Sequence, residues 1–329
     1  MSKLEVICIG EALIDKIINK SDSNFKNYLG GAPANVACAL SKLKVPTAFI
    51  GCLGDDDFGR EFIQLFQKLN INIEFVQIAK QSSTRVVKVM RDEFGDRSFS
   101  GFQKTKYNIF ADESLDKLLL SKNIKNLKQK FLNTKYIVTG TNLLSSSKSA
   151  ESLYFILDFA KNFRIKVIID INWREIFWDN SIANKSSHLK EVKNFLHYAD
   201  ILKLASEEAY LFFDTNDPSE ISKVLINQPD VIITNGANAI KWYVNGIKGS
   251  NDVVKHTSEI IDTTGAGDAF LAGLISRYYF DTNLDDQSKI KDSIKFASVC
   301  GLLTCFGKGA IEQQPEGSLV YKFLEDFGS

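Results

Sequence analysis

The sequence has no excess of either charge, few histidines and no paired-cysteine motif. It contains 40 Lys and Arg, 40 Asp and Glu, and three His among 329 residues. The zero net charge removes the electrostatic argument for a nucleic acid or an acidic membrane surface as partner. Three histidines argue against a multi-histidine metal site and a Ser-His-Asp triad. The five cysteines form no C-x-x-C and lie mostly in apolar runs, so we expect buried free thiols in a reducing compartment.

Signatures of membrane insertion, secretion and the commonest nucleotide sites are also missing. No apolar run reaches about 18 residues, and the N-terminus enters a strand pattern directly instead of a signal peptide. We therefore expect a soluble, cytoplasmic protein. There is no G-x-x-x-x-G-K-[ST] loop, no helix-opening G-x-G-x-x-G and no protein-kinase catalytic loop. If the protein binds a nucleotide, it would use a binding motif other than these.

The chain does contain a regular alternation of apolar runs and helical patterns. Short apolar runs typical of central strands occur at Leu4–Gly10, Thr47–Gly51, Tyr136–Gly140, Lys166–Asp170, Ile201–Leu204 and Val231–Thr234. Helical patterns lie between them, at Ala34–Lys42, Phe58–Lys68, Ser149–Phe163, Leu189–His197 and Ser206–Phe213. This alternation predicts an α/β fold in which helices cover both faces of a mostly parallel sheet. Because no linker or repeat divides the chain, we expect one domain over residues 1–329.

Two segments break this rhythm. Ala12–Asn19 continues from the first strand with no helix signal, and Thr84–Gly101 reads as a hairpin with β-branched arms and a DEFGD turn. An all-β piece cannot easily join a fully covered parallel sheet, so a small separate sheet is expected. Ligands bind at the carboxyl ends of the strands in such folds. The small sheet is therefore either a lid that excludes water or a hairpin without a function.

The stretch Asp262–Leu274, DTTGAGDAFLAGL, predicts an anion site with a carboxylate beside it. Gly265, Ala266 and Gly267 bring bare backbone to what we expect to be a helix start, where unpaired N–H groups and the helix dipole hold anions. Asp268 follows at once. A carboxylate beside an anion suggests a base or a metal ligand, which points to transfer of a phosphoryl group to an acceptor that Asp268 deprotonates. The alternative is a turn that uses glycine for tight packing.

A second glycine-rich turn, Leu29–Asn35, has the features of a sugar-binding turn. Gly30 and Gly31 permit close approach, and the Asn35 side chain can both donate to and accept from a polyhydroxyl ligand. A plain turn before a helix is the alternative. Asp15, in an apolar strand-like segment, is either an exposed lid residue or an acceptor for two sugar hydroxyls.

Other polar clusters follow predicted strands. We expect the acids of Gly51–Gly59 to cap a helix. We expect Asp170, Asn172, Arg174 and Trp178 to lie where a ligand could reach them. Glu207 and Glu208 could reach the waters of a magnesium ion, but a solvated helix start is the stronger interpretation.

The blocks Gly30–Gly59 and Asp262–Leu274 resemble the two signatures of the ribokinase-like, PfkB-type sugar kinases. The first block and DINWREIFW (Asp170–Trp178) most resemble fructokinases. The resemblance implies a three-layer α/β/α fold with a β-sheet lid at about 12–28 and 84–108. It also implies an ATP-dependent, magnesium-requiring kinase that acts on a primary hydroxyl of a free sugar, with fructose giving fructose 6-phosphate.

The resemblance also assigns roles to residues. Asp268 would be the base, and Gly265, Ala266 and Gly267 the anion hole. Contacts to the sugar would come from Asp15, Gly31, Asn35 and Arg174. Nucleotide contacts would come from Thr234, Gly236, Cys305 and Gly309. Glu208 would hold magnesium through water, and Asp262 and Thr264 a monovalent cation such as K⁺.

Several alternatives remain open. The substrate could be ribose, 2-keto-3-deoxygluconate or another ketose. The protein could be a catalytically silent relative that serves as an interaction subunit, although the base and the glycines are all present. An α/β hydrolase or dehydrogenase lacks its fingerprint residues here. A homodimer through the lid is a further expectation, because the arm with Val86, Val87 and Val89 would offer apolar surface.

Overall fold

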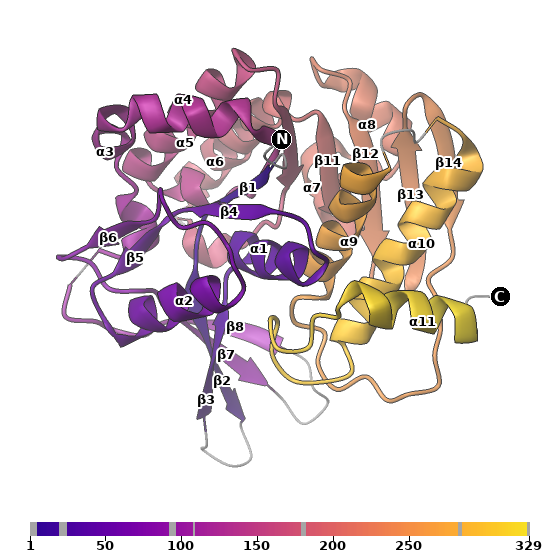
Figure 1. Ribbon diagram of the computed structural model, residues 1–329, viewed down its shortest axis with the longest axis horizontal. Helices are drawn as coiled ribbons and strands as arrows, with labels where there is room; N and C mark the ends of the chain where they lie inside the picture. Colours follow the sequence, from indigo (N-terminus) through magenta and orange to yellow (C-terminus); the bar gives the residue numbers. More distant parts are fainter. Residues whose placement is uncertain are drawn as a thin grey trace.

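An eight-stranded sheet runs through the middle of the protein (Figure 1). The computed structural model describes residues 5–19, 25–91, 97–107, 109–178, 182–281 and 285–327. The strand order is β14-β13-β12-β11-β10-β9-β1-β4, and all neighbours from β12 to β4 are parallel. The strands are β1 Glu5–Ile9, β4 Thr47–Ile50, β9 Thr134–Thr139, β10 Lys166–Asp170, β11 Ile201–Ala205, β12 Asp230–Asn235, β13 Asn238–Val244 and β14 Ile247–Asn251. The predicted, mostly parallel sheet is confirmed, with an antiparallel hairpin at one edge.

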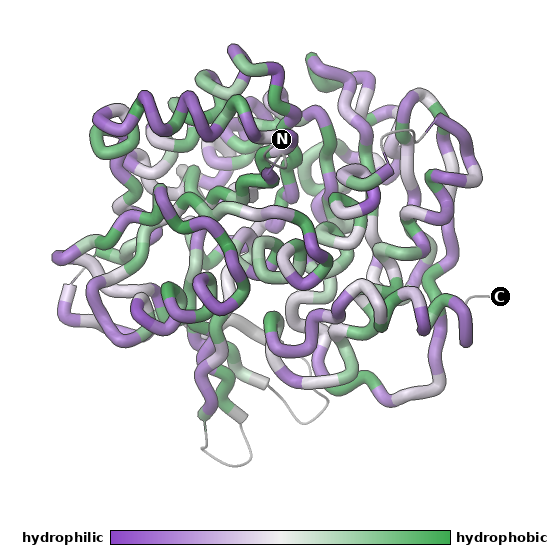
Figure 2. Tube along the Cα trace, in the orientation of Figure 1, coloured by the Kyte–Doolittle hydropathy of each residue, from purple (hydrophilic) through white to green (hydrophobic). Residues whose placement is uncertain are grey.

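Helices cover both faces of this sheet, because its central strands are apolar on both sides. In β1, Val6 and Cys8 pack into one core while Ile7 and Ile9 pack into the other. The first core is shared with α1 Ala32–Lys42, α2 Asp57–Lys68, α9 Ala266–Phe280, α10 Gln287–Thr304 and α11 Gly317–Phe327. The second is shared with α3 Lys117–Lys122, α4 Ile124–Leu132, α5 Ser147–Lys161, α6 Ile182–Phe195, α7 Ser206–Phe213 and α8 Pro218–Val224. In Figure 2 the apolar strands lie between more polar helix surfaces.

Short elements complete the chain. A parallel pair is formed by β5 Cys52–Gly54 and β6 Gln77–Ala79. The 3₁₀ turns are η1 Ala111–Ser114, η2 Asn142–Ser145, η3 Glu175–Phe177 and η4 Leu196–Tyr198. At the acidic turn, Asp56 accepts a hydrogen bond from the Gly59 amide and caps α2, as predicted. No helix in the described ranges combines the length and apolar character needed to cross a membrane. The five cysteines are buried thiols that form no disulfide with one another, as expected.

The predicted separate sheet is present and projects from the main body (Figure 1). Its order is β3-β2-β7-β8, with β2 Leu13–Asn19, β3 Phe25–Gly30, β7 Val86–Arg91 and β8 Arg97–Phe102. The hairpin pairing of β7 with β8 is antiparallel. The DEFGD turn at positions 92–96 lies outside the described residues. We refer to these four strands as the small sheet.

The expectation of an exposed apolar arm on the small sheet is wrong. Val86, Val87 and Val89 are all buried within the chain. Val87 and Val89 pack with Leu13 of β2, and partly buried aromatic rings cover this cluster. Small apolar residues on a strand are therefore used for the internal contact between the small sheet and the body. A homodimer stays a prediction, and these valines do not support it.

Candidate active site

A cavity of about 340 Å³ lies where the carboxyl ends of the central strands meet the small sheet. Ligand sites are expected at this edge of a parallel sheet. Eight of the predicted site residues line the cavity: Asp15, Gly31, Asn35, Arg174, Thr264, Gly265, Gly267 and Asp268. The others, among them Ala266, do not line it. The cavity is also lined by Glu11, Asn142, Asn172 and Lys203. Apolar side chains from β2 and β7 of the small sheet complete the lining.

The glycine-rich turn opens α9, as predicted. Gly265 has φ of 76°, and a Cβ there would lie 2.7 Å from the Cβ of Ala310, so only glycine fits without strain. The Ala266 amide donates to the Thr263 carbonyl and the Ala269 amide to the Gly265 carbonyl. Gly267 and Asp268 lie between these two residues, and their amides have no hydrogen-bond acceptor among the described residues. Two unpaired N–H groups at a helix N-terminus form a site that favours an anion.

Asp268 and Asn35 lie together although they come from different glycine-rich turns. Nδ2 of Asn35 donates a 2.8 Å hydrogen bond to Oδ2 of Asp268. Burial raises the pKa of Asp268 to about 6, while the bond from Asn35 and the charges of Lys203 and Arg174 oppose that shift. A carboxylate with a pKa near the working pH suits a general base. Gly31, which caps α1 with φ of 98°, approaches the Glu11 carbonyl so closely that a Cβ would lie 2.7 Å from it.

Lys203 is a site residue that the sequence patterns did not identify. Its Nζ lies 2.9 Å and 3.1 Å from the two carboxylate oxygens of Asp170, and 3.2 Å from where a Cβ on Gly267 would stand. Burial works against the charged amine, but the carboxylates of Asp170, Glu208 and Asp268 together raise its pKa. Lys203 therefore brings a positive charge to the anion site. The available signal was a lysine inside the apolar strand ILKLA.

The geometry places a carboxylate, unpaired amides and a buried cation around one polar cavity, and the similarity to known proteins agrees with this arrangement. A family model described as "pfkB family carbohydrate kinase" matches residues 3–317. The chain belongs to the pfkB family of carbohydrate kinases. Over 336 residues it is 30% identical to the Arabidopsis thaliana protein named "Probable fructokinase-7", covering 98% of this chain and 93% of that one.

Solved structures share the fold of this pfkB-family kinase. The fructokinase from Vibrio cholerae O395 in a fructose, ADP and calcium ion bound form has a TM-score of 0.80 and 26% identity. A double mutant of that fructokinase in a fructose, ADP and potassium ion bound form has a TM-score of 0.82 and 26% identity. Each match covers 98% of this chain and 100% of the other. The predicted ribokinase-like α/β fold and the assignment as a sugar kinase, a phosphotransferase, are thereby confirmed.

In this kinase, Asp262 organises the loop that carries the anion site. Its Oδ1 accepts hydrogen bonds from the amide and the hydroxyl of Thr264, and its Oδ2 accepts one from the Gly309 amide. The Cys305 carbonyl accepts from the amides of Ile261 and Asp262. Hydrogen bonds thus link the predicted nucleotide residues Cys305 and Gly309 to the predicted cation residues Asp262 and Thr264.

Predictions for three residues of the polar clusters around β10 and β11 are wrong. Glu207 is exposed in the first turn of α7, as expected, but Glu208 in the same turn is only 8% exposed, and its two oxygens accept the amides of Trp173 and Ala205. Asp170 is buried by its ion pair with Lys203 and is not open to a ligand. Trp178 is buried too, and its ring stacks on that of Trp173 with 4.8 Å between the ring centroids. Asn172 and Arg174 do line the cavity.

A second cavity, of about 680 Å³, lies beside the turn between β12 and β13. It is lined by residues 237–239, 251–255, Lys295 and Phe327. Thr234 is the second-to-last residue of β12, just before this turn, and Gly236 has φ of 54° within the turn. In the sequence, the predicted nucleotide residues Thr234 and Gly236 therefore come just before residues that line this cavity, which is large enough for a small-molecule group.

Proposed function

We propose that this kinase phosphorylates D-fructose at a primary hydroxyl, with ATP as the phosphoryl donor, to give fructose 6-phosphate and ADP. The observation that carries the proposal is Asp268, a carboxylate with its pKa raised to about 6, beside the unpaired amides of α9 in a polar cavity. Similarity to the Vibrio cholerae fructokinase in its fructose and ADP bound form supports the choice of sugar and nucleotide.

In the proposed reaction the sugar hydroxyl attacks the γ-phosphorus of ATP. An oxygen–phosphorus bond forms to the sugar, the bond to the β-phosphate oxygen breaks, and Asp268 receives the hydroxyl proton. The amides at Gly267 and Asp268 and the amine of Lys203 face the transferring group and stabilise its charge. Gly265 and Ala266 shape the turn, and the Ala266 amide stabilises the turn by donating a hydrogen bond to the Thr263 carbonyl.

Contacts to the sugar are proposed for Asp15, Gly31, Asn35 and Arg174, all of which line the cavity. We propose that the whole chain acts as one domain and that the small sheet is a lid. The support is that Leu13, Ile17 and Val87 of that sheet line the same cavity as Asp268. Thr234, Gly236, Cys305 and Gly309 are proposed to contact the nucleotide.

Magnesium and a monovalent cation are proposed cofactors. No group of three potential ligands stands ready in the parts of the chain that the structure describes. Magnesium needs no such cage, because it is commonly held by phosphates, waters and one or two carboxylates. Glu208 is proposed to act through a water of the ion, because each of its oxygens accepts one amide and can accept a second donor. When bound, the ion neutralises phosphate charge. Asp262 and Thr264 are proposed to border a potassium site, which the potassium bound form of the relative supports.

A second candidate substrate is a sugar acid such as 2-keto-3-deoxygluconate, because the cations Arg174 and Lys203 both line the cavity. Ribose and ketoses other than fructose remain weaker candidates. A silent interaction protein is also a weaker candidate, since the base, the glycines and the cation are all present. We also infer a cytoplasmic location, because five cysteines that are buried and form no disulfide suit a reducing compartment.

An ADP-release assay over a panel of hexoses, pentoses and sugar acids tests the proposal. It should be run with ATP and magnesium, with potassium present and absent. The highest kcat/KM is expected for D-fructose. A clear preference for another sugar would reassign the substrate, and negligible rates with every sugar would overturn kinase activity altogether.

A further inference from the structure

Two residues that line the cavity each carry a buried amide oxygen with no hydrogen-bond partner among the described residues. These oxygens are Oδ1 of Asn35 and Oδ1 of Asn142. Asn142 is 6% exposed and begins η2, directly after the loop that follows β9. Leaving a buried acceptor unpaired is unfavourable. Such an atom at a cavity wall therefore indicates a ligand that supplies a donor.

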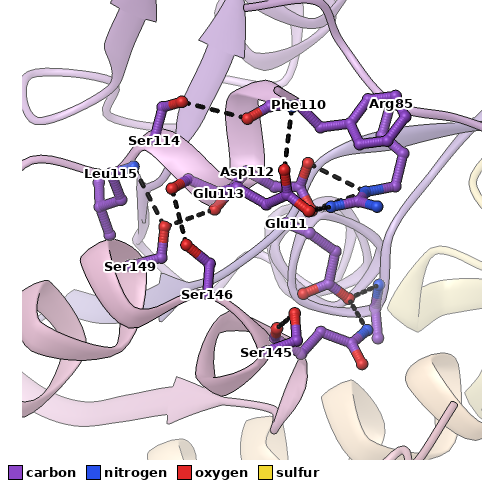
Figure 3. A network of polar contacts seen from close by, with 12 residues as sticks. Glu11, Arg85, Phe110, Asp112, Glu113, Ser114, Leu115, Ser145, Ser146 and Ser149 are labelled. Carbon is purple, nitrogen blue, oxygen red and sulfur yellow. Dashed lines mark hydrogen bonds and ion pairs between the residues drawn. The ribbon is translucent and has the colours of Figure 1, made fainter. Parts of the chain in front are cut away.

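Glu11 determines which way the Asn142 amide points. Nδ2 of Asn142 donates a 3.0 Å hydrogen bond to Oε1 of Glu11, and the same oxygen accepts one of 3.2 Å from the Ala32 amide. Glu11 is 2% exposed and lies below the Arg85–Asp112 ion pair in the view of Figure 3. Burial raises the pKa of Glu11 to about 7, but a proton on Oε2 would leave Oε1 an acceptor. The amide nitrogen therefore faces Glu11 in both protonation states, which turns Oδ1 away from it.

We propose that Oδ1 of Asn142 accepts a hydrogen bond from one hydroxyl of the sugar, and that Glu11 is a positioning residue that holds the amide in this orientation. The inference rests on the proposed use of this cavity by a sugar. Asn35 has the same arrangement, because its Nδ2 is occupied by Asp268 and its Oδ1 is unpaired. Two oriented amide oxygens give the cavity fixed acceptors for two hydroxyl donors.

Through Oε1, Glu11 also connects two elements that form the wall. Its bond to Ala32 fixes the start of α1, just after Gly31, and its bond to Asn142 fixes the start of η2. These starts are 110 positions apart in the chain (142 − 32). A site built to pair with a hydroxyl discriminates strongly against an analogue that lacks it, because the site's own polar group is then left unpaired.

Asn142→Leu removes the amide with little change in size, and Asn162→Leu on an exposed helix end is the matched control. Each variant and the wild type are assayed with the best sugar of the panel and with its monodeoxy analogues. We expect Asn142→Leu to lower kcat/KM for the parent sugar about 10- to 100-fold, mainly through the sugar KM, with the ATP KM unchanged. For the one analogue that lacks the bonded hydroxyl, wild type and variant should agree within about twofold.

Variants of Glu11 test the positioning role. Glu11→Gln keeps an Oε1 acceptor and should stay within about threefold of wild type, whereas Glu11→Met should raise the sugar KM about tenfold. An active wild type with the same variant-to-wild-type ratio for every analogue, or with no loss in Asn142→Leu, overturns this inference alone. A wild type that phosphorylates no sugar overturns the proposed function, and this inference with it.

Discussion

Asn35 and Asp268, 233 positions apart in the chain, are joined by a 2.8 Å hydrogen bond from Nδ2 to Oδ2. This bond brings the two glycine-rich turns, at the starts of α1 and α9, to one point. It stabilises the ionised carboxylate and so opposes the effect of burial on the pKa of Asp268. Asn35, which is proposed to hold the sugar, therefore also lowers the pKa of Asp268, the residue proposed to deprotonate the sugar.

Asn35→Ala should move the acidic limb of the pH profile of kcat/KM to higher pH. A base works only when deprotonated, and removing the donor raises the pKa of Asp268 above about 6. The position of the limb is measured, because the height of the profile will also fall if the sugar loses a contact. Asn162→Ala is the control, and a limb that stays in place would contradict the coupling.

Asp268→Asn should lower kcat by at least about 10²- to 10⁴-fold, the usual loss on removing a general base. The amide is nearly isosteric, and its oxygen can still accept from Asn35, so the fold should persist. Single-turnover measurement of sugar phosphate at saturating ATP checks the chemical step directly. Wild-type turnover in this variant would remove Asp268 from the mechanism.

The same substitution should stabilise the protein at neutral and alkaline pH. The pKa of Asp268 is raised from 3.8 to about 6, so the ionised form opposes folding above pH 6, and this penalty fades as the pH falls toward 4. Asp268→Asn removes it and should add roughly 1–3 kcal/mol to the free energy of unfolding at pH 8. Urea denaturation at pH 8 and pH 4 gives the test, and an equal difference at both pH values would refute it.

Lys203→Met should destabilise the kinase by roughly 3–5 kcal/mol, because Asp170 would be left as an unpaired buried charge. The double variant with Asp170→Leu should recover most of that stability. Both variants should remain at least about tenfold slower in kcat, since the cation beside Gly267 is gone. A stable double variant with wild-type kcat would limit Lys203 to a structural role.

Arg85→Met should destabilise the attachment of the small sheet and weaken sugar binding. Arg85 is 2% exposed and pairs with Asp112 and Glu113 (Figure 3). Its guanidinium carbon also lies 4.8 Å from the ring centroid of Phe177, a residue that lines the cavity. Loss of roughly 3–5 kcal/mol is expected from the unpaired acids. The sugar KM should rise more than the ATP KM. Lys88→Met, on the strand β7 that directly follows Arg85, is the control, and equal changes in the two KM values would argue against a lid.

Several features of the protein are determined by the sequence alone. The alternation of apolar runs with helical patterns is enough to predict the parallel sheet, since a strand covered on both faces must be apolar at successive positions. The turn that opens α9 is equally local, because the left-handed backbone at Gly265 and the N-terminal amides depend on neighbouring residues. The separate hairpin of β7 and β8 follows from its own pattern too.

Contacts between distant segments were decided only by the tertiary structure. In the sequence, Lys203 is only a charged residue in an apolar strand, whereas the structure shows its ion pair with Asp170 at 2.9 Å. The structure likewise shows that Asn142 donates to Glu11 through Nδ2, which makes its Oδ1 a candidate contact for the sugar. Val87 was expected on a surface and is buried, because burial depends on which element packs against a strand. A short-range pattern specifies backbone and periodicity, whereas the partner of a polar or apolar side chain comes from elsewhere in the chain.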